Sequence, residues 1–194
     1  RDERPRSGFT LQRLARFRPA FRSGGTVTAA NSCGVNDGAA GVLMVDGATH
    51  AQLGVPGLRV LSVATAGGDP RRPGWGIVPA ATRALADAGV AASDLDAVEC
   101  NEAFAGQVIA CLRAWQNDDY CRTRLGLPGA LGEIDAARLN IDGGAVALGH
   151  PVGASGVRIV LHLLQALRRT GGKRGIATIC IGGGLGGAML VEAL

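Results

Sequence analysis

The clearest structural signal in the sequence is Ile179-Cys180-Ile181-Gly182-Gly183-Gly184-Leu185-Gly186-Gly187, where an apolar strand ends and a run of glycines follows at once. We expect strands at 175–181 and 188–193, paired as a hairpin through a long glycine loop. A thiol at a strand end can meet a substrate while N–H groups of the loop stabilise negative charge. A buried apolar cysteine is usually inert, so these residues alone leave both interpretations of Cys180 open.

Upstream of this hairpin, segments with strand and helix character alternate. Strands are expected at 25–29, 58–66 and 93–99, and helices at 37–46 (capped by Asn36 or Asp37), 79–88, 102–115 and 155–169. This alternation is typical of an α/β sheet with parallel strands. Residues 117–139 are interpreted as an irregular excursion. The last helix is expected to bury one apolar face, formed by Val157, Val160, Leu161, Leu164 and Leu167.

Two more clusters place polar residues next to strand ends, where α/β sheets have their ligand sites. One is Asn101-Glu102-Ala103-Phe104, in which Asn101 could simply cap a helix. The other runs from Gly143 to Gly156, and His150 is nearly its only polar side chain. A histidine there can donate to an oxyanion or exchange a proton, or it can be a buried structural residue. The other two histidines lack such a setting and are expected to be structural.

Composition sets broad limits on the function. The 194 residues are 47% hydrophobic, so the chain can bury a core, and its 31 glycines have no collagen period. No apolar run reaches the roughly 18 residues of a membrane span. Residues 1–22 carry a net charge of +5 and the remainder a net of −1. This basic arm lacks a nucleic-acid motif, whereas an arginine cluster also suits the phosphates of a nucleotide-like ligand.

The five cysteines, at positions 33, 100, 111, 121 and 180, form no CxxC pair, and no histidine stands at zinc-ligand spacing. Neither a disulfide framework nor a metal site is expected. Together with the lack of a recognisable export signal, this favours a reducing, cytoplasmic compartment. A single reactive thiol is the remaining possibility.

Taken in order, the motifs at 101–104, 143–156 and 180–184 resemble the C-terminal half of the thiolases, the acyl-CoA acetyltransferase family. The segment 25–40 resembles that family's entry into its C-terminal domain. The resemblance begins near Phe21 and implies a thiolase C-terminal domain at 25–194, preceded by a basic arm at 1–24. The implied fold is α/β, a mixed sheet flanked by helices that forms one half of a five-layer αβαβα architecture.

The resemblance also implies a reaction, the reversible Claisen condensation or thiolytic cleavage of 3-ketoacyl-CoA, with a coenzyme A thioester as substrate and no cofactor or metal. His150 would activate the nucleophile and help to bind the thioester oxygen. Cys180 would exchange a proton with the α-carbon of acetyl-CoA. Asn101 would hold a water that forms one oxyanion hole with His150, and the backbone N–H of Gly182 would belong to the other.

Coenzyme A contacts carry over to four positions, Phe21, Ala29, Cys33 and Phe104. Cys33 stands where the family often has serine, which would weaken a hydrogen bond to the pantetheine amide. The segment 73–79 and the long excursion also depart from the family pattern. These departures leave the acyl chain length of the substrate open.

The Cys-x-Ser-Gly helix start that carries the thiolase nucleophile has no counterpart in this sequence. We therefore expect a partner chain to supply the N-terminal half, or the chain to be part of a longer protein. A homo- or hetero-oligomer would cover the apolar surface that faces the other half. No nucleic acid or membrane partner is expected. The alternatives are a non-catalytic module that binds coenzyme A or another protein, and a ketoacyl synthase, which shares the fold but resembles a Cys-His-His set.

Overall fold

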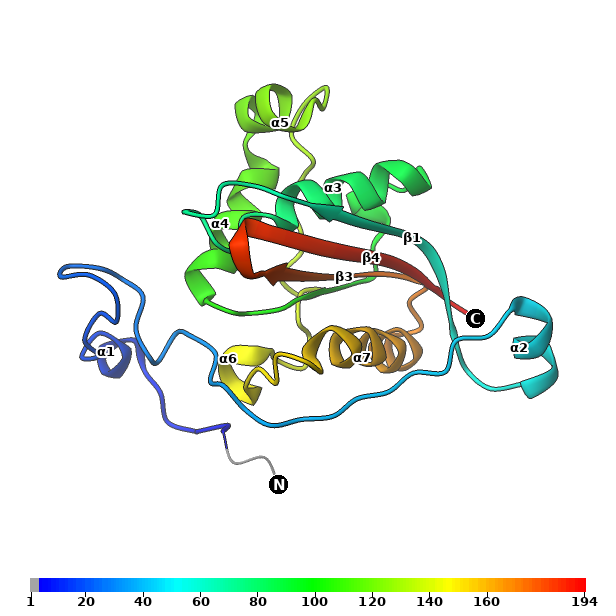
Figure 1. Cartoon of the computed structure of the whole chain (residues 1–194), viewed down its shortest axis with the longest axis horizontal. Coiled ribbons are helices and arrows are strands. Elements are labelled where there is room, and N and C mark those ends of the chain that lie inside the picture. The colour runs from blue at the N-terminus through cyan, green and yellow to red at the C-terminus, as the bar shows by residue number, and fades with distance from the viewer. Residues whose placement is uncertain (1–3) are drawn as a thin grey trace.

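The computed structural model describes residues 4–194, so the first three residues of the predicted arm lie outside it (Figure 1). The helices are α1 (Leu11–Leu14), α2 (Gly47–Leu53), α3 (Ile77–Ala88), α4 (Ala105–Gln116), α5 (Asp118–Leu125), α6 (Ala145–Leu148) and α7 (Ser155–Thr170), with 3₁₀ turns η1 (Ala92–Asp94) and η2 (Gly182–Gly184). The strands are β1 (Leu58–Ala66), β2 (Ala97–Cys100), β3 (Arg174–Ile181) and β4 (Leu185–Ala193). None of the described helices is both long enough and apolar enough to cross a membrane.

The four strands form one mixed sheet in the order β1-β4-β3-β2. Strands β2 and β3 are parallel, whereas β4 is antiparallel to both β1 and β3. The predicted mixed sheet is therefore confirmed. The register places Cys100 beside Thr178 and Cys180 beside Gly186, so the motif residues gather at one end of the sheet.

Helices cover both faces of the sheet, as Figure 1 shows. Helices α3 and α4 pack on one face and α7 on the other. On the first face Ile77 and Trp115 are buried with the sheet residue Leu190, and on the second Leu163 and Leu167 are buried with Val191. This two-sided burial fixes the sheet and with it the strand ends that carry the motifs.

Most elements of the body agree with the sequence prediction. Strand β1 has the predicted bounds, and the two closing strands pair as predicted. The turn between them is shorter than expected, because β4 already begins at Leu185 and only η2 separates the strands. The excursion at 117–139 contains a helix that was not predicted, α5, whose cap is the side chain of Asn117.

The apolar face of α7 was predicted wrongly. Of the five residues expected to be buried, only Leu167 is; the buried face consists of Ser155, Ile159, Leu163, Ala166 and Leu167. The helix rests with this row against β2 and β3, and the residues of the predicted row are half-buried at its side. Because apolar residues surround most of this helix, periodicity alone chose the wrong row.

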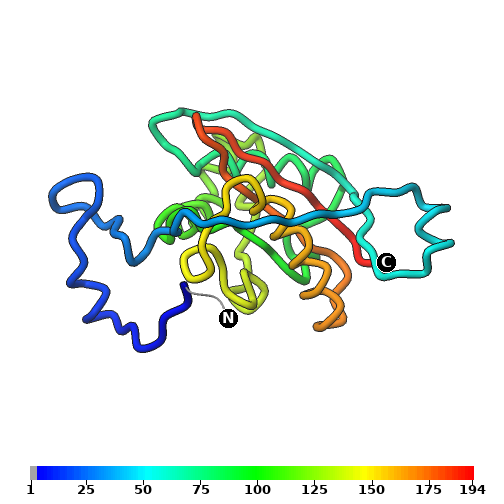
Figure 2. Tube along the Cα trace, turned by 60° about the horizontal axis from the view of Figure 1, so that its bottom comes forward, coloured from blue at the N-terminus to red at the C-terminus, as the bar shows by residue number. Residues whose placement is uncertain are grey.

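The N-terminal segment departs furthest from the prediction. The strand expected at 25–29 is reduced to a single bridge between Pro19 and Thr28, and the helix expected at 37–46 is absent. Residues 33–46 instead form an extended segment, here called the strap, which crosses over α6 and α7 (Figure 2). Its apolar residues are consecutive rather than spaced at helical intervals, which is the pattern of a strand buried on both faces. The helix capped by an acidic residue occurs later, as α2 behind Asp46.

Candidate functional site

Three backbone hydrogen bonds join the sequence motifs into one site. The Asn101 N–H donates to the Thr178 carbonyl over 2.9 Å, and this ties the 101–104 motif to β3 two residues before Cys180. The Cys33 N–H donates to Ala103 over 3.0 Å, and the His150 N–H donates to Gly34 over 2.7 Å. The turn at the start of the strap thus connects the 101–104 motif with residues 142–150, here called the histidine loop.

Asn101 is the buried polar centre of this site. The residue is 2% exposed, and neither its amide nitrogen nor its amide oxygen has a hydrogen-bond partner within residues 4–194. Its side chain does not cap a helix, because α4 begins at Ala105 and its N-cap residue is Phe104. Burying an unpaired amide costs free energy, and a bound water or ligand atom would remove that cost.

His150 is held in one tautomer by Ser155. The imidazole Nδ1 lies 2.6 Å from the Ser155 hydroxyl oxygen, and that hydroxyl donates to the Pro151 carbonyl over 3.1 Å. Since the hydroxyl proton is used in this way, the oxygen accepts from Nδ1–H, and Nε2 keeps a free lone pair. Burial, aided by the positive charge of Arg158, lowers the pKa of His150. A neutral imidazole with a free nitrogen can accept a proton.

Cys180 is half-buried at the end of β3, and Gly182 is exposed just beyond it. Burial raises the pKa of the Cys180 thiol, a hydrogen bond from the backbone opposes this, and the nearby Cys33 raises the pKa further. The pKa of Cys33 is also raised, mainly by burial. Both groups are therefore thiols at neutral pH and can donate a proton to a strong base.

Two side chains that the sequence analysis missed hold this site in place. The Glu102 carboxylate accepts hydrogen bonds from the Asn140 amide (2.8 Å) and from the Val146 N–H (3.1 Å), and so it fixes α6. Gly144 is required beside it, because a Cβ there would overlap the Glu102 carboxylate. The other residue is Ser155. It precedes the buried Ile159 and Leu163 of α7 by four and eight residues, and this helical spacing is the signal that could have revealed it.

The four positions predicted to contact coenzyme A lie partly together. Phe21 is exposed and packs edge-on against Phe104, with ring centroids 6.0 Å apart. Phe104 in turn forms a bridge with Ser32, next to Cys33. Ala29 is exposed and, within residues 4–194, forms no hydrogen bond or β-bridge with the other three. Within residues 4–194, no three His, Cys, Asp or Glu side chains are grouped so that they could hold a metal ion.

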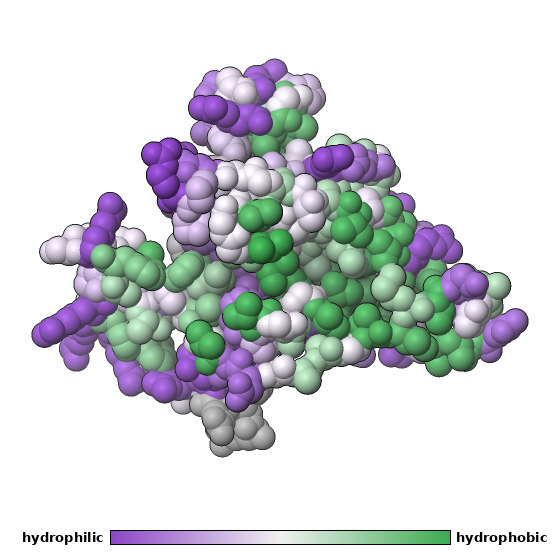
Figure 3. All heavy atoms as spheres, viewed as in Figure 1, coloured by the Kyte–Doolittle hydropathy of each residue, from purple (hydrophilic) through white to green (hydrophobic). Residues whose placement is uncertain are grey.

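The strap leaves an apolar surface beside the site. Leu43 and Met44 are 80% and 81% exposed, and Val42 and Val45 are also exposed. Residues 38–45 make no backbone hydrogen bond to any other part of the described chain. Figure 3 shows apolar residues spread over the face of the molecule that includes the strap. Such an unpaired, extended apolar segment can pair with the edge of another sheet.

Comparison with known proteins gives two family matches. Residues 55–193 match the model of the thiolase C-terminal domain, and residues 1–48 match that of the thiolase N-terminal domain. An acetyl-CoA acetyltransferase of Pseudomonas aeruginosa is 48% identical over 97% of this chain, and that of Shinella zoogloeoides is 46% identical over all of it. The matches cover 44% and 45% of those relatives, so the chain spans less than half of their length.

Solved structures give the same result. The chain is similar over its full length to a crystal structure of Bacillus anthracis acetyl-CoA acetyltransferase, with a TM-score of 0.85 and 38% identity, and covers 45% of that chain. It is also similar to human mitochondrial 3-ketoacyl-CoA thiolase in complex with CoA, with a TM-score of 0.81 and 36% identity over 45% of that chain.

Proposed function

The chain belongs to the thiolase family, and we propose that it forms the part of an acyl-CoA acetyltransferase that supplies the acid/base cysteine, the histidine and the oxyanion-hole asparagine. The reaction is the reversible Claisen condensation, or thiolytic cleavage, of a 3-ketoacyl-CoA. The observation that carries this proposal is the buried side-chain amide of Asn101, which has no partner within residues 4–194. Backbone hydrogen bonds connect its segment to β3 and, through Cys33 and Gly34, to the histidine loop. A buried amide in such a frame is suited to hold a water against a thioester oxygen.

The protonation states of His150 and Cys180 support complementary roles. A neutral His150, oriented through Ser155, takes the proton of a nucleophilic thiol on the other half of the enzyme. In cleavage that thiolate attacks the keto carbonyl, the bond between the α- and β-carbons breaks, and the Cys180 thiol gives its proton to the enolate of acetyl-CoA; the acyl group left on the nucleophilic sulfur then passes to the thiol of free CoA. Condensation is the reverse: the departing CoA thiolate takes the proton of Cys180, and the Cys180 thiolate so formed removes the α-proton of the next acetyl-CoA. Two groups whose pKa values are shifted in opposite senses can thus act as base and acid at one pH.

Fixed donors stabilise the negative charge that develops in both steps. We assign one oxyanion hole to His150 with a water on Asn101, and the other to the backbone N–H of Gly182, which follows Cys180 by two residues. Removing one donor from such a hole typically costs about 2.7–4 kcal/mol of transition-state stabilisation. The exposed place of Gly182 at the end of β3 leaves room for a thioester.

Coenzyme A is the proposed ligand of the surface formed by Phe21, Cys33 and Phe104, with Ala29 at its margin. The aromatic pair offers an apolar wall, and the arginines of the basic arm suit the phosphates of the nucleotide end. A structural relative was solved with CoA, which supports this assignment. A domain division into an arm at 1–24 and a catalytic domain at 25–194 stays a prediction.

The strap is where we propose that the N-terminal thiolase half docks, in a homo- or hetero-oligomer. Its exposed apolar side chains and unpaired backbone fit the addition of a strand to a sheet of that half. The coverage of the relatives, about 45% of their length, supports the same conclusion. The five free thiols favour a reducing location, and we propose the cytoplasm.

A mixing experiment tests this proposal. The chain is assayed for CoA-dependent cleavage of acetoacetyl-CoA alone and together with the unmatched part of the Pseudomonas aeruginosa relative. We expect no turnover by the chain alone, turnover in the mixture, and a loss of at least about a hundredfold in Cys180→Ala and His150→Ala. The matched controls Cys121→Ala and His50→Ala should keep their activity. Turnover by the chain alone, or CoA binding without turnover in the mixture, would contradict the proposal.

A further inference from the structure

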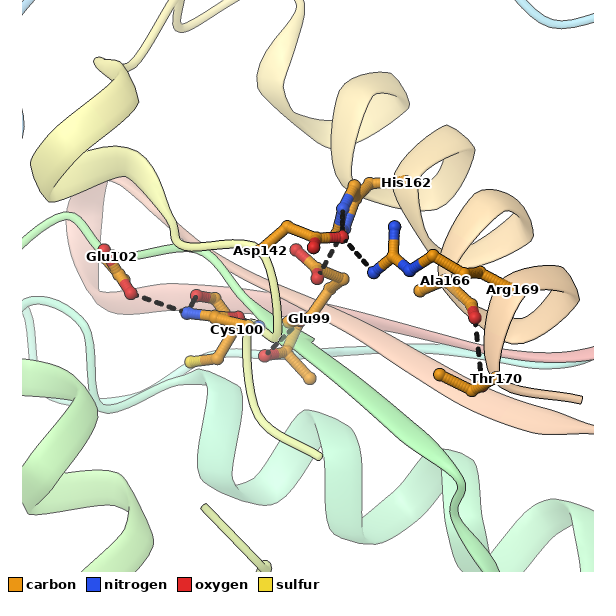
Figure 4. Close-up of polar contacts among 10 residues, drawn as sticks. Glu99, Cys100, Glu102, Asp142, His162, Ala166, Arg169 and Thr170 are labelled. Carbon is orange, nitrogen blue, oxygen red and sulfur yellow. Dashed lines mark hydrogen bonds and ion pairs between the residues drawn. The ribbon is translucent and has the colours of Figure 1, made fainter. Parts of the chain in front are cut away.

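His162, expected from the sequence to be a plain structural residue, bridges two carboxylates. Its Nδ1 lies 2.7 Å from a Glu99 carboxylate oxygen, and its Nε2 lies 2.7 Å from a carboxylate oxygen of Asp142. The same oxygen of Asp142 accepts a hydrogen bond from Arg169 over 2.6 Å (Figure 4). Glu99 is 5% exposed, so its charge is buried.

These contacts connect the two segments that carry the proposed catalytic residues. Glu99 lies on β2 two residues before Asn101, and Asp142 opens the loop that leads through α6 to His150. Helix α7 holds the far end of that loop as well, because Arg158 donates to the Gly149 carbonyl over 3.0 Å. One helix therefore anchors the strand end and both ends of the histidine loop.

We propose that His162 is a positioning residue, which in its doubly protonated form ties the strand end that carries Asn101 and the loop that carries His150 to α7. Only the imidazolium has two N–H donors, so only this form satisfies both carboxylates at once. When the proton is lost, the remaining N–H stays with Glu99, because a buried carboxylate without a partner is far more costly than the half-exposed Asp142, which still has Arg169. The Asp142 end of the histidine loop is then released from His162.

The charged groups around the imidazole agree with this behaviour. Glu99 faces it from β2 and Asp142 from the loop, while on α7 Arg158 lies about one turn before it and Arg169 about two turns after it. The hydrogen bond with Glu99 is the main reason why the pKa of His162 is raised, and partial burial opposes it. The protonated form therefore persists to a higher pH than that of an unperturbed histidine.

The inference rests on the roles proposed for His150 and Asn101, and its test does not depend on turnover. In the 194-residue chain, the imidazole carbon resonances of the three histidines are followed by NMR against pH. We expect the His150 resonance to show its own inflection and a second one at the pKa of His162. In His162→Gln the second inflection should disappear, and in the control His50→Gln both should remain.

Asp142→Asn provides a second variant that keeps the shape of the side chain and removes its charge. It should move the His162 inflection to lower pH by about one unit, and the second inflection of His150 should move with it. This variant decides the matter even if His162→Gln does not fold. A single inflection for His150 in the wild-type chain, or a second inflection that stays in place in both variants, would overturn the inference. Absence of turnover in the mixing experiment would leave these resonances unaffected.

Discussion

The strap and helix α7 lie next to each other and are both rich in apolar residues. Those of α7 are largely buried, whereas those of the strap are largely exposed. Helix α7 covers Leu163 and Leu167 completely against the sheet, whereas the strap leaves Leu43 and Met44 almost fully exposed. The difference lies in the partners available: α7 has a sheet face within the chain, and the strap has none within residues 4–194. An apolar segment in the sequence thus shows that a surface has to be buried. Whether the same chain supplies the surface that buries it depends on the fold.

The largest difference between these regions should appear in the stability of the isolated chain. Leu163→Ala removes a completely buried side chain and leaves a cavity, so we expect the free energy of unfolding to fall by about 2–5 kcal/mol. Leu43→Ala, the matched control in the strap, should change it by less than about 0.5 kcal/mol. Urea denaturation of both variants measures this. Equal losses would mean that the strap is packed against the body in solution.

The strap should matter in association instead. Leu43→Asp places a charge on the surface proposed to pair with the N-terminal half, so we expect binding of the unmatched part of the Pseudomonas aeruginosa relative to weaken by at least about tenfold, or about 1.4 kcal/mol. Urea denaturation of the isolated chain should be unchanged. Isothermal titration calorimetry measures the affinity, with Leu53→Asp on the exposed side of α2 as the control. Unaltered affinity would exclude the strap as the docking surface.

Substitution of Ser155, a buried residue of α7, should have a smaller effect, mainly on catalysis. Ser155→Ala removes the acceptor that holds His150 through Nδ1, so the imidazole can rotate and exchange tautomers. We expect kcat in the reconstituted mixture to fall by about tenfold with little change in KM, and the free energy of unfolding to fall by about 1 kcal/mol. Ser62→Ala, which removes a hydroxyl bonded to the Ala84 carbonyl on the opposite face of the sheet, is the control for hydroxyl loss. A rise in KM with kcat unchanged would argue against a positioning role.

The sequence was sufficient to predict secondary structure where a local pattern is compatible with only one kind of element. Strand β1, bounded by Pro56-Gly57 and Gly67-Gly68, has its predicted bounds, and the closing hairpin forms beside Cys180. The pattern failed at residues 37–46, which were predicted as a helix from short-range signals and instead run extended over α6 and α7. The frame around Asn101 and His150 depends on bonds from Cys33 and Gly34, more than 60 positions earlier in the chain. The spacing of residues in the sequence does not predict such long-range hydrogen bonds, and it does not predict the bond between His162 and Glu99.

The smallest predicted effect distinguishes the two histidines of the body by their pH dependence. Because the pKa of His162 is raised in the folded chain, its stabilisation is complete below the pKa of an unfolded histidine, about 6.5, and is lost as the pH rises through the higher folded value. His150 has a lowered pKa, so its contribution is present above about 6.5 and is lost as the pH falls through the folded value.

The two trends oppose each other in the wild-type chain, and His162→Gln separates them. We expect the stability difference between wild type and His162→Gln, measured by urea denaturation, to shrink above pH 6.5 by less than about 1 kcal/mol, since solvent screens the partly exposed imidazole. A difference that grows with pH would mean that His162 is neutral in the folded chain, and the link between α7 and the histidine loop would then rest on Arg169 and Arg158 alone.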